Sequence, residues 1–100
     1  MRPPGPPGQD FIDDALRLLK EWFGDAREIR RTLHISDAEH AALTERIKVA
    51  SDVFQLRPEV RRADGNTQIR VRTADGSTIN AGAVALAARI EAAYQAVTGR

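Results

Sequence analysis

From Leu56 to Ile90 the chain reads LRPEVRRADGNTQIRVRTADGSTINAGAVALAARI, and this stretch carries its clearest structural signals. Pro58 ends any helix that precedes it, because proline cannot donate a backbone hydrogen bond. A turn signal over 63–66 then separates Val60 and its neighbours from residues 67–73, in which polar and apolar side chains alternate. The stretch therefore predicts a β-hairpin that is followed by a helix.

The second strand of this hairpin has two chemically different faces. Its side chains divide into Thr67, Ile69, Val71 and Thr73 on one side and Gln68, Arg70 and Arg72 on the other. Successive side chains of a strand point to opposite faces of a sheet. The first face is therefore predicted to pack on a hydrophobic core, and the second is predicted to meet solvent.

Helix signals lie on both sides of the hairpin. After a turn at Asp75-Gly76, Asn80 is a suitable N-cap for a helix over 81–97, and Gly99 stands just beyond that helix. Upstream, Ser36-Asp37-Ala38-Glu39 forms a capping box that predicts the start of a long helix. The buried side of the long helix is expected to consist of Leu43, Ile47, Ala50 and Phe54.

The N-terminal third adds a helix, a strand and a tail. Apolar residues recur at three- and four-residue steps over 10–23, and Gly24 is suited to cap that helix. Residues 27–35 are expected to be extended. Residues 1–9 hold all but one of the five prolines and are predicted to form a flexible tail in front of a single domain over 10–100. Helices on one face of an antiparallel sheet make an α+β fold.

Composition excludes several classes of protein. The chain has 15 Lys and Arg against 14 Asp and Glu, so its net charge of +1 provides no general attraction to nucleic acid or anionic lipid. The absence of cysteine excludes disulfides and thiolate chemistry. No apolar run approaches the roughly 20 residues of a membrane span, and the N-terminus lacks the apolar segment of a secretory signal. We expect a cytoplasmic protein without membrane contacts.

The stretch over 56–90 resembles the C-terminal half of the pterin-4a-carbinolamine dehydratases. That family carries His-His-Pro ahead of a hairpin, then Thr-His-Asp, and then a final helix rich in Leu and Ala. Pro58, Thr73, Asp75 and the helix segment 86–90 stand here in the matching order and spacing. The resemblance implies the family's fold, in which three helices pack on one face of an antiparallel sheet.

The family's three histidine positions hold Leu56, Arg57 and Ala74 in this chain. The resemblance implies dehydration of a 4a-hydroxy-tetrahydropterin, which needs a group that takes a proton and an acid that protonates the departing hydroxide. Imidazole suits both roles because its pKa lies close to working pH. Leucine and alanine carry no titratable proton, and arginine stays charged. The sequence therefore predicts a degenerate member with the scaffold but without the dehydratase site.

The other histidines, His34 and His40, lie outside the motif and are expected to be surface or packing residues. Neither is spaced with a second ligand on one element, so no metal site is expected, and no cofactor is predicted. The resemblance also implies a cleft in the place of the family's pterin pocket, which we call the old cleft. If this cleft is kept for a ligand, its expected lining is Trp22, Leu56, Arg57, Pro58, Thr73, Ala74 and Asp75. Arg57 would then anchor a carboxylate or enolate beside Asp75. The structural alternative makes Trp22 a core residue and Asp75 a turn residue.

A second candidate surface is basic. Arg61, Arg62, Arg70 and Arg72 lie on the same hairpin as Arg57. They are candidates for contact with an acidic protein segment or another anionic partner, and the alternative is an ordinary solvated sheet face. Nucleic acid is not the expected partner, because the chain has few aromatic side chains on which bases could stack.

Three functions remain open. We favour a binding or assembly protein, because the resembled family includes assembly factors and transcriptional cofactors. The second is a repurposed small-molecule enzyme, an isomerase or cyclase, in a pocket widened by Leu56 and Ala74. The third is an active dehydratase that uses other residues. The family's habit of assembling, together with a free sheet edge expected at 67–73, predicts a homodimer or homotetramer.

Overall fold

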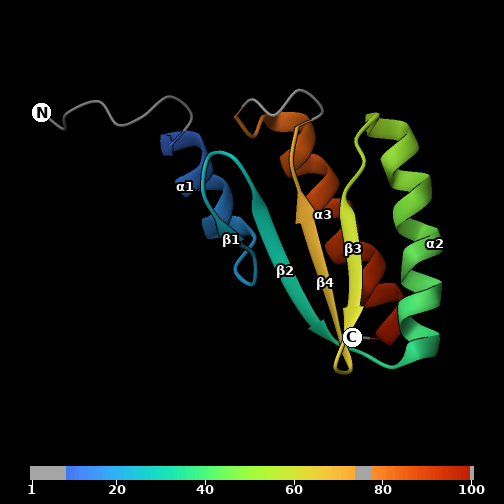
Figure 1. The fold of residues 1–100 in the computed structure, drawn as a ribbon. Helices are drawn as coiled ribbons and strands as arrows, with labels where there is room; N and C mark the ends of the chain where they lie inside the picture. Colours follow the sequence, from blue (N-terminus) through green and yellow to red (C-terminus); the bar gives the residue numbers. More distant parts are fainter. Residues whose placement is uncertain (1–8, 74–77, 100) are drawn as a thin grey trace, which may run out of the picture.

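The computed structural model describes residues 9–73 and 78–99, and its elements follow the predicted order (Figure 1). They are α1 (Gln9–Leu18), β1 (Phe23–Gly24), β2 (Ile29–His34), α2 (Asp37–Phe54), β3 (Glu59–Ala63), β4 (Asn66–Val71) and α3 (Ala81–Thr98). The strands form one antiparallel sheet in the order β1-β2-β4-β3, and the helices pack on one of its faces. This is the predicted α+β fold. Of the predicted tail, only Gln9 is described, and it begins α1.

The β3–β4 hairpin confirms the predicted alternation. Val60 stands opposite Ile69, and Arg62 stands opposite Thr67. The face that was expected to be inside is buried, and it consists of Thr67, Ile69, Val71 and Thr73. The turn between the strands has positive φ at both Asp64 and Gly65, 52° and 77°, which matches the twist that two-residue hairpins require.

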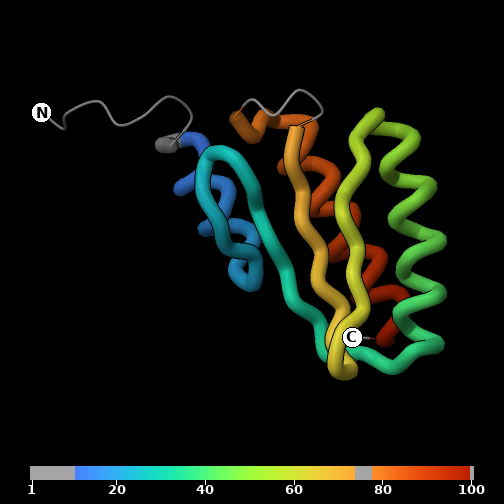
Figure 2. The backbone as a smooth tube through the Cα atoms, viewed as in Figure 1, coloured from blue at the N-terminus to red at the C-terminus, as the bar shows by residue number. Residues whose placement is uncertain are grey.

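β4 lies inside the sheet, so the prediction of a free edge at 67–73 is wrong. β2 pairs with β4 from Ile29–Val71 to His34–Asn66, while β3 occupies the other side of β4. Figure 2 shows how α2 carries the chain away from β2 before the hairpin returns beside it. This pairing joins segments that are far apart in the sequence, and local alternation carries no information about it. The edges of the sheet are β1 and β3.

The prediction that the first helix ends at Gly24 is also wrong. α1 ends at Leu18, and Gly24 lies in β1 with a φ of 148°. A Cβ at this position would stand 2.1 Å from the backbone oxygen of Glu28. Glycine is therefore required for the close approach of β1 to the start of β2, and not for a helix cap.

The caps and the buried side of the two long helices are mostly as predicted. Ser36 and Glu39 form the capping box, and Asn80 Oδ1 accepts a hydrogen bond from the Ala83 amide at 3.0 Å. Leu43 and Ile47 are buried in α2, whereas Ala50 and Phe54 are only partly buried against the core. Ser51 is also buried on α2, although it is polar. Its hydroxyl group donates a hydrogen bond to the Ile47 carbonyl at 2.6 Å and is therefore satisfied inside the protein.

Candidate functional site

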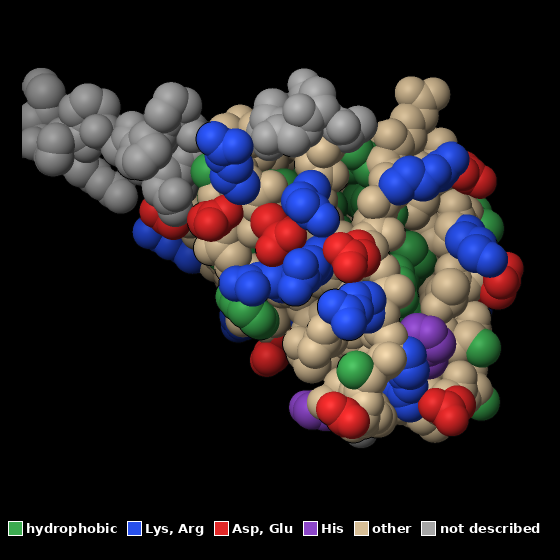
Figure 3. All heavy atoms as spheres, in the orientation of Figure 1, with side chains coloured by type: hydrophobic (Ala, Val, Ile, Leu, Met, Phe, Trp, Pro, Cys, Tyr) green, Lys and Arg blue, Asp and Glu red, His purple; other side chains and the backbone are tan. Residues whose placement is uncertain are grey.

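A groove of about 420 Å³ lies between α2 and β3. Its walls are built from Thr44, Ile47, Lys48, Ser51 and Asp52 of α2 and from Arg57, Pro58 and Val60 of the segment that leads into β3. Figure 3 shows a hollow between the sheet and α2 in which hydrophobic side chains are visible. The groove thus combines an apolar floor with a charged rim, as small-molecule sites commonly do.

Arg57 stands at the end of this groove where α2 gives way to β3. Gln55 ends α2 in the left-handed conformation, with a φ of 54°, and this turns the chain back over the helix. Arg57 Nη1 consequently lies 3.0 Å from Asp52 Oδ1, with 78% and 73% of the two side chains exposed. The carboxylate beside Arg57 is therefore Asp52. The predicted partner, Asp75, lies outside the described residues.

The other candidates for the old cleft do not all meet at the groove. Pro58 lines it together with Arg57. Leu56 is 8% exposed and belongs to the hydrophobic core, and Thr73 is buried beyond the end of β4. Trp22 precedes β1, the strand at the opposite edge of the sheet from β3. Its buried position supports the structural alternative, in which the ring is part of the core. Ala74 lies outside the described residues.

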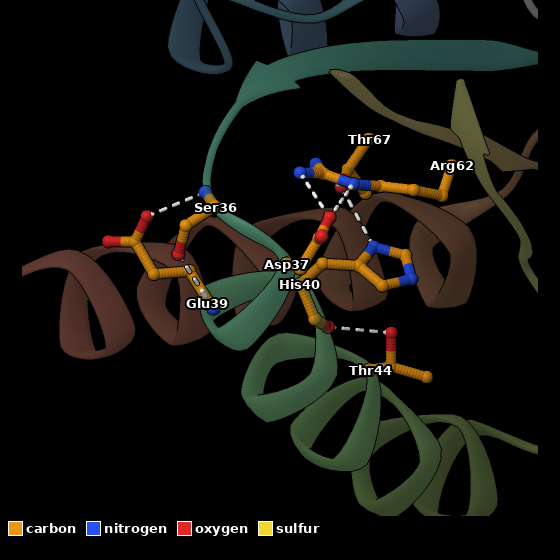
Figure 4. A network of polar contacts seen from close by, with 7 residues as sticks. All are labelled: Ser36, Asp37, Glu39, His40, Thr44, Arg62 and Thr67. Carbon is orange, nitrogen blue, oxygen red and sulfur yellow. Dashed lines mark hydrogen bonds and ion pairs between the residues drawn. The ribbon is translucent and has the colours of Figure 1, made fainter. Parts of the chain in front are cut away.

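The end of the groove near the start of α2 adjoins a network of polar contacts (Figure 4). Thr67 is fully buried, and its hydroxyl oxygen lies 2.8 Å from His40 Nδ1. Arg62 Nη1 donates to the same oxygen at 3.1 Å, and its other terminal nitrogen lies 2.9 Å from Asp37 Oδ1. Thr44, which lines the groove, donates to the His40 backbone carbonyl at 2.8 Å.

Sequence reasoning missed this network. His40 was expected to be an ordinary surface or packing residue, and Arg62 was grouped with the basic surface. The strand register explains the difference, because Arg62 stands opposite Thr67 and therefore shares the face that the helices cover. The one local signal was the spacing of His40 and Thr44, four residues apart on the predicted helix, which places both side chains on one side.

The outer face of the sheet carries the remaining predicted arginines. None of the described helices covers it, and Figure 3 shows basic and acidic side chains mixed across it. Arg72 lies 3.4 Å from both Glu28 and Glu59. Arg61 and Arg70 have no ion-pair partner within 9–73 and 78–99.

The described part of the chain contains neither a metal site nor a membrane-spanning helix. Its residues include no group of three or more His, Cys, Asp or Glu side chains that could hold a metal ion. None of its helices has the length and apolar character needed to cross a membrane.

Comparison with known proteins identifies the fold. No model of a protein family matches the sequence, and no curated protein shows a significant match to it. The crystal structure of a transcriptional coactivator/pterin dehydratase from Brucella melitensis superposes on this chain with a TM-score of 0.74, over 82% of this chain and 90% of that one. This chain has the pterin dehydratase fold. Because the identity is 16%, this likeness shows the fold alone.

Proposed function

We propose that this chain is a binding protein on the pterin dehydratase fold and that it has no dehydratase activity. The observation that carries the proposal is the state of the two described positions at which the sequence resemblance implies histidines. Leu56 is enclosed in the core, and Arg57 is directed to Asp52. Neither side chain can take up and release a proton at neutral pH in the way that imidazole does.

The two histidines of the chain are poorly placed to substitute. His34, at the end of β2, is hydrogen-bonded to Asn66. His40 precedes Asp52 by twelve residues on the same helix, which corresponds to about 18 Å along the axis. A group at that distance cannot exchange a proton with an atom held beside Arg57, because general acid–base catalysis needs hydrogen-bond contact.

A dehydration assay tests the proposal directly. The 4a-carbinolamine is generated in a stopped-flow instrument, and its loss is followed with this protein and, as a positive control, with an active pterin dehydratase. We expect the rate with this protein to equal the spontaneous rate. Turnover well above that rate would overturn the proposal. A His34→Gln/His40→Gln variant would then show whether the two histidines or other groups perform the chemistry.

Binding has two candidate surfaces, the α2–β3 groove for a small molecule and the outer sheet face for a protein partner. The outer face is favoured for a partner by Arg61 and Arg70, which form no ion pair with a described carboxylate. An acidic segment laid across the sheet would complement them. In this role the protein would act in assembly, and the sheet would be covered only in the complex.

The second candidate function is a repurposed isomerase or cyclase that works in the groove. It is favoured by the charged groups of Lys48, Asp52 and Arg57 above an apolar floor, an arrangement that can polarise a bound carbonyl. Asp52→Asn keeps the shape of this side chain and removes the negative charge of its carboxylate. In a screen of carbonyl substrates, turnover that is lost in Asp52→Asn but kept in Glu45→Gln would favour the enzyme over the binding protein.

A further inference from the structure

We propose that His40 presents a fixed hydrogen-bond donor, Nε2–H, at the α2–β3 groove, and that the groove takes a small, uncharged, mostly apolar molecule with a carbonyl oxygen. The inference rests on the proposed use of the groove as a binding site. It adds the ligand class and a residue that the family resemblance does not point to.

The first step concerns the proton on the His40 ring. Arg62 always donates, so the Thr67 oxygen accepts its hydrogen bond. Thr67 is fully buried, and within the described residues the other partner of this oxygen is His40 Nδ1. The hydroxyl proton therefore goes to Nδ1, because a buried hydroxyl without an acceptor is costly. A neutral imidazole that accepts at Nδ1 carries its proton on Nε2.

The second step concerns the direction of that donor. The two ring nitrogens lie on different sides of the imidazole, so Nε2 is turned away from Thr67. Figure 4 shows the ring beside Thr44 on the same side of α2, beneath the strand that carries Arg62. Thr44 is part of the groove wall, one helical turn beyond His40. Nε2 has no partner among residues 9–73 and 78–99, so this donor is available to a ligand.

The third step concerns charge. Lys48 and Arg57 line the groove and Arg62 adjoins one end of it, and each of these cations has its own carboxylate. Lys48 pairs with Glu45 at 3.3 Å, Arg57 with Asp52 at 3.0 Å, and Arg62 with Asp37 at 2.9 Å. A charged ligand would have to compete with one of these pairs, whereas an uncharged ligand leaves all of them in place. The groove therefore favours a neutral molecule.

The fourth step concerns shape and polarity. Ile47, Pro58 and Val60 supply an apolar surface inside a volume of about 420 Å³, which lies within the usual range for small-molecule sites. An aromatic ketone satisfies each requirement, since its ring covers the apolar surface and its oxygen accepts one hydrogen bond.

The first experiment measures the tautomer. In uniformly ¹⁵N-labelled protein, long-range ¹H–¹⁵N correlation spectra distinguish protonated from unprotonated ring nitrogens, and a His34→Gln variant assigns the remaining set to His40. We expect the proton on Nε2 in the wild-type protein, and loss of that fixed state in Thr67→Val, which has the same shape without the hydroxyl. A proton on Nδ1 in the wild-type protein would overturn the inference.

The second experiment measures the ligand class with a matched pair of probes. 2-Acetonaphthone and 2-isopropenylnaphthalene have nearly the same shape, but only the ketone accepts a hydrogen bond. NMR titration should place both in the groove, with shifts at Thr44, Ile47 and Val60, and with the ketone bound about fivefold more tightly. His40→Leu should abolish the preference for the ketone and leave the affinity for the hydrocarbon unchanged.

Two matched variants test whether His40 is the group that donates to the ketone. Thr67→Ser retains the hydroxyl and should retain the ketone preference, which shows that a change at this buried site does not by itself remove it. Arg57, at the other end of the groove, is the rival donor, and Arg57→Ala tests it. If Arg57→Ala abolishes the preference, Arg57 is the donor and the assignment to His40 is wrong.

The outcomes distinguish this inference from the proposed function. Equal affinities of the two probes for the groove would contradict a hydrogen-bond donor at His40, while the groove would remain a binding site. A lack of groove shifts with either probe would count against this inference and against the groove as a binding site, and the outer sheet face would remain the candidate surface of the proposed function. Each variant is first compared with the wild type by urea unfolding, so that a loss of folding is not taken for a loss of binding.

Discussion

Trp22 Nε1 donates a hydrogen bond to Glu91 Oε1 at 2.8 Å and so ties the segment after α1 to the last helix, 69 residues later. The same carboxylate oxygen accepts from Arg31 Nε at 2.6 Å, and the Arg31 guanidinium lies over the ring of Tyr94. The ion pair between Arg31 and Glu91 is largely enclosed, with 13% and 21% of the side chains exposed. Trp22 therefore has a structural role on this side of the molecule, away from the α2–β3 groove.

Removing this carboxylate should destabilise the protein. Glu91→Ala leaves the Trp22 indole and the Arg31 guanidinium without their acceptor in a partly buried position, and we expect a loss of about 2–3 kcal/mol in the free energy of unfolding. Urea unfolding followed by tryptophan fluorescence measures it. Glu45→Ala, which breaks only the exposed pair with Lys48, should cost less than about 0.5 kcal/mol. Equal effects of the two substitutions would contradict the structural role of Glu91.

Arg57 should matter for an anionic ligand and hardly at all for stability. Its pair with Asp52 is exposed, so Arg57→Ala should change the unfolding free energy by less than about 1 kcal/mol. 2-Naphthoate should bind more weakly than the neutral ketone, because its carboxylate has to displace Asp52 from Arg57. Arg57→Lys should weaken this binding further, nearly as much as Arg57→Ala, because only the planar guanidinium can bind a carboxylate through two parallel hydrogen bonds. Wild-type affinity in Arg57→Ala would show that Arg57 is an ordinary surface residue.

The outer sheet face should control contacts with an acidic partner. Fluorescence anisotropy with a labelled Glu-rich peptide measures this binding, and we expect it to weaken as salt rises. Arg61→Glu/Arg70→Glu should weaken it at least tenfold and leave the binding of 2-acetonaphthone unchanged. Arg17→Glu/Arg46→Glu makes the same change in net charge on α1 and α2, and it is the matched control. Equal losses in the two double variants would show that only overall charge matters.

We still predict a homodimer or homotetramer, although the predicted edge at 67–73 is inside the sheet. Two other features support assembly, namely the free edge of β3 and the exposed Val49 and Val53 on α2, whose exposed fractions are 68% and 67%. Light scattering at micromolar concentration should give a multiple of the 11.0 kDa chain mass. Val49→Lys/Val53→Lys should lower that mass if α2 forms the contact, whereas Ala41→Lys on the same helix should not.

A wild-type mass of a single chain at these concentrations would contradict the prediction of a homo-oligomer. An oligomer that persists in Val49→Lys/Val53→Lys would instead place the contact elsewhere, with β3 as the remaining candidate.

The local structure of the chain can be read from the order of its residues. Ser36 with Glu39 specifies the start of α2, Asp64-Gly65 specifies the hairpin turn, and the alternation over 67–73 specifies which face is buried. Each of these features depends on residues that are close neighbours in the chain, so it is visible without a structure. The α+β fold followed from the order of these elements, and the resemblance to pterin dehydratases followed from the order and spacing of Pro58, Thr73, Asp75 and the helix segment 86–90.

Contacts between distant segments became visible only in the folded chain. β4 lies between β2 and β3, Arg57 turns toward Asp52, and His40 is joined to Arg62 through the buried hydroxyl of Thr67. These contacts depend on strand register and on how α2 lies across the sheet, which are set by the packing of the whole core. If β3 were shifted by one residue against β4, Arg62 would turn to solvent and its contact with Thr67 would be lost, although the local sequence would be the same.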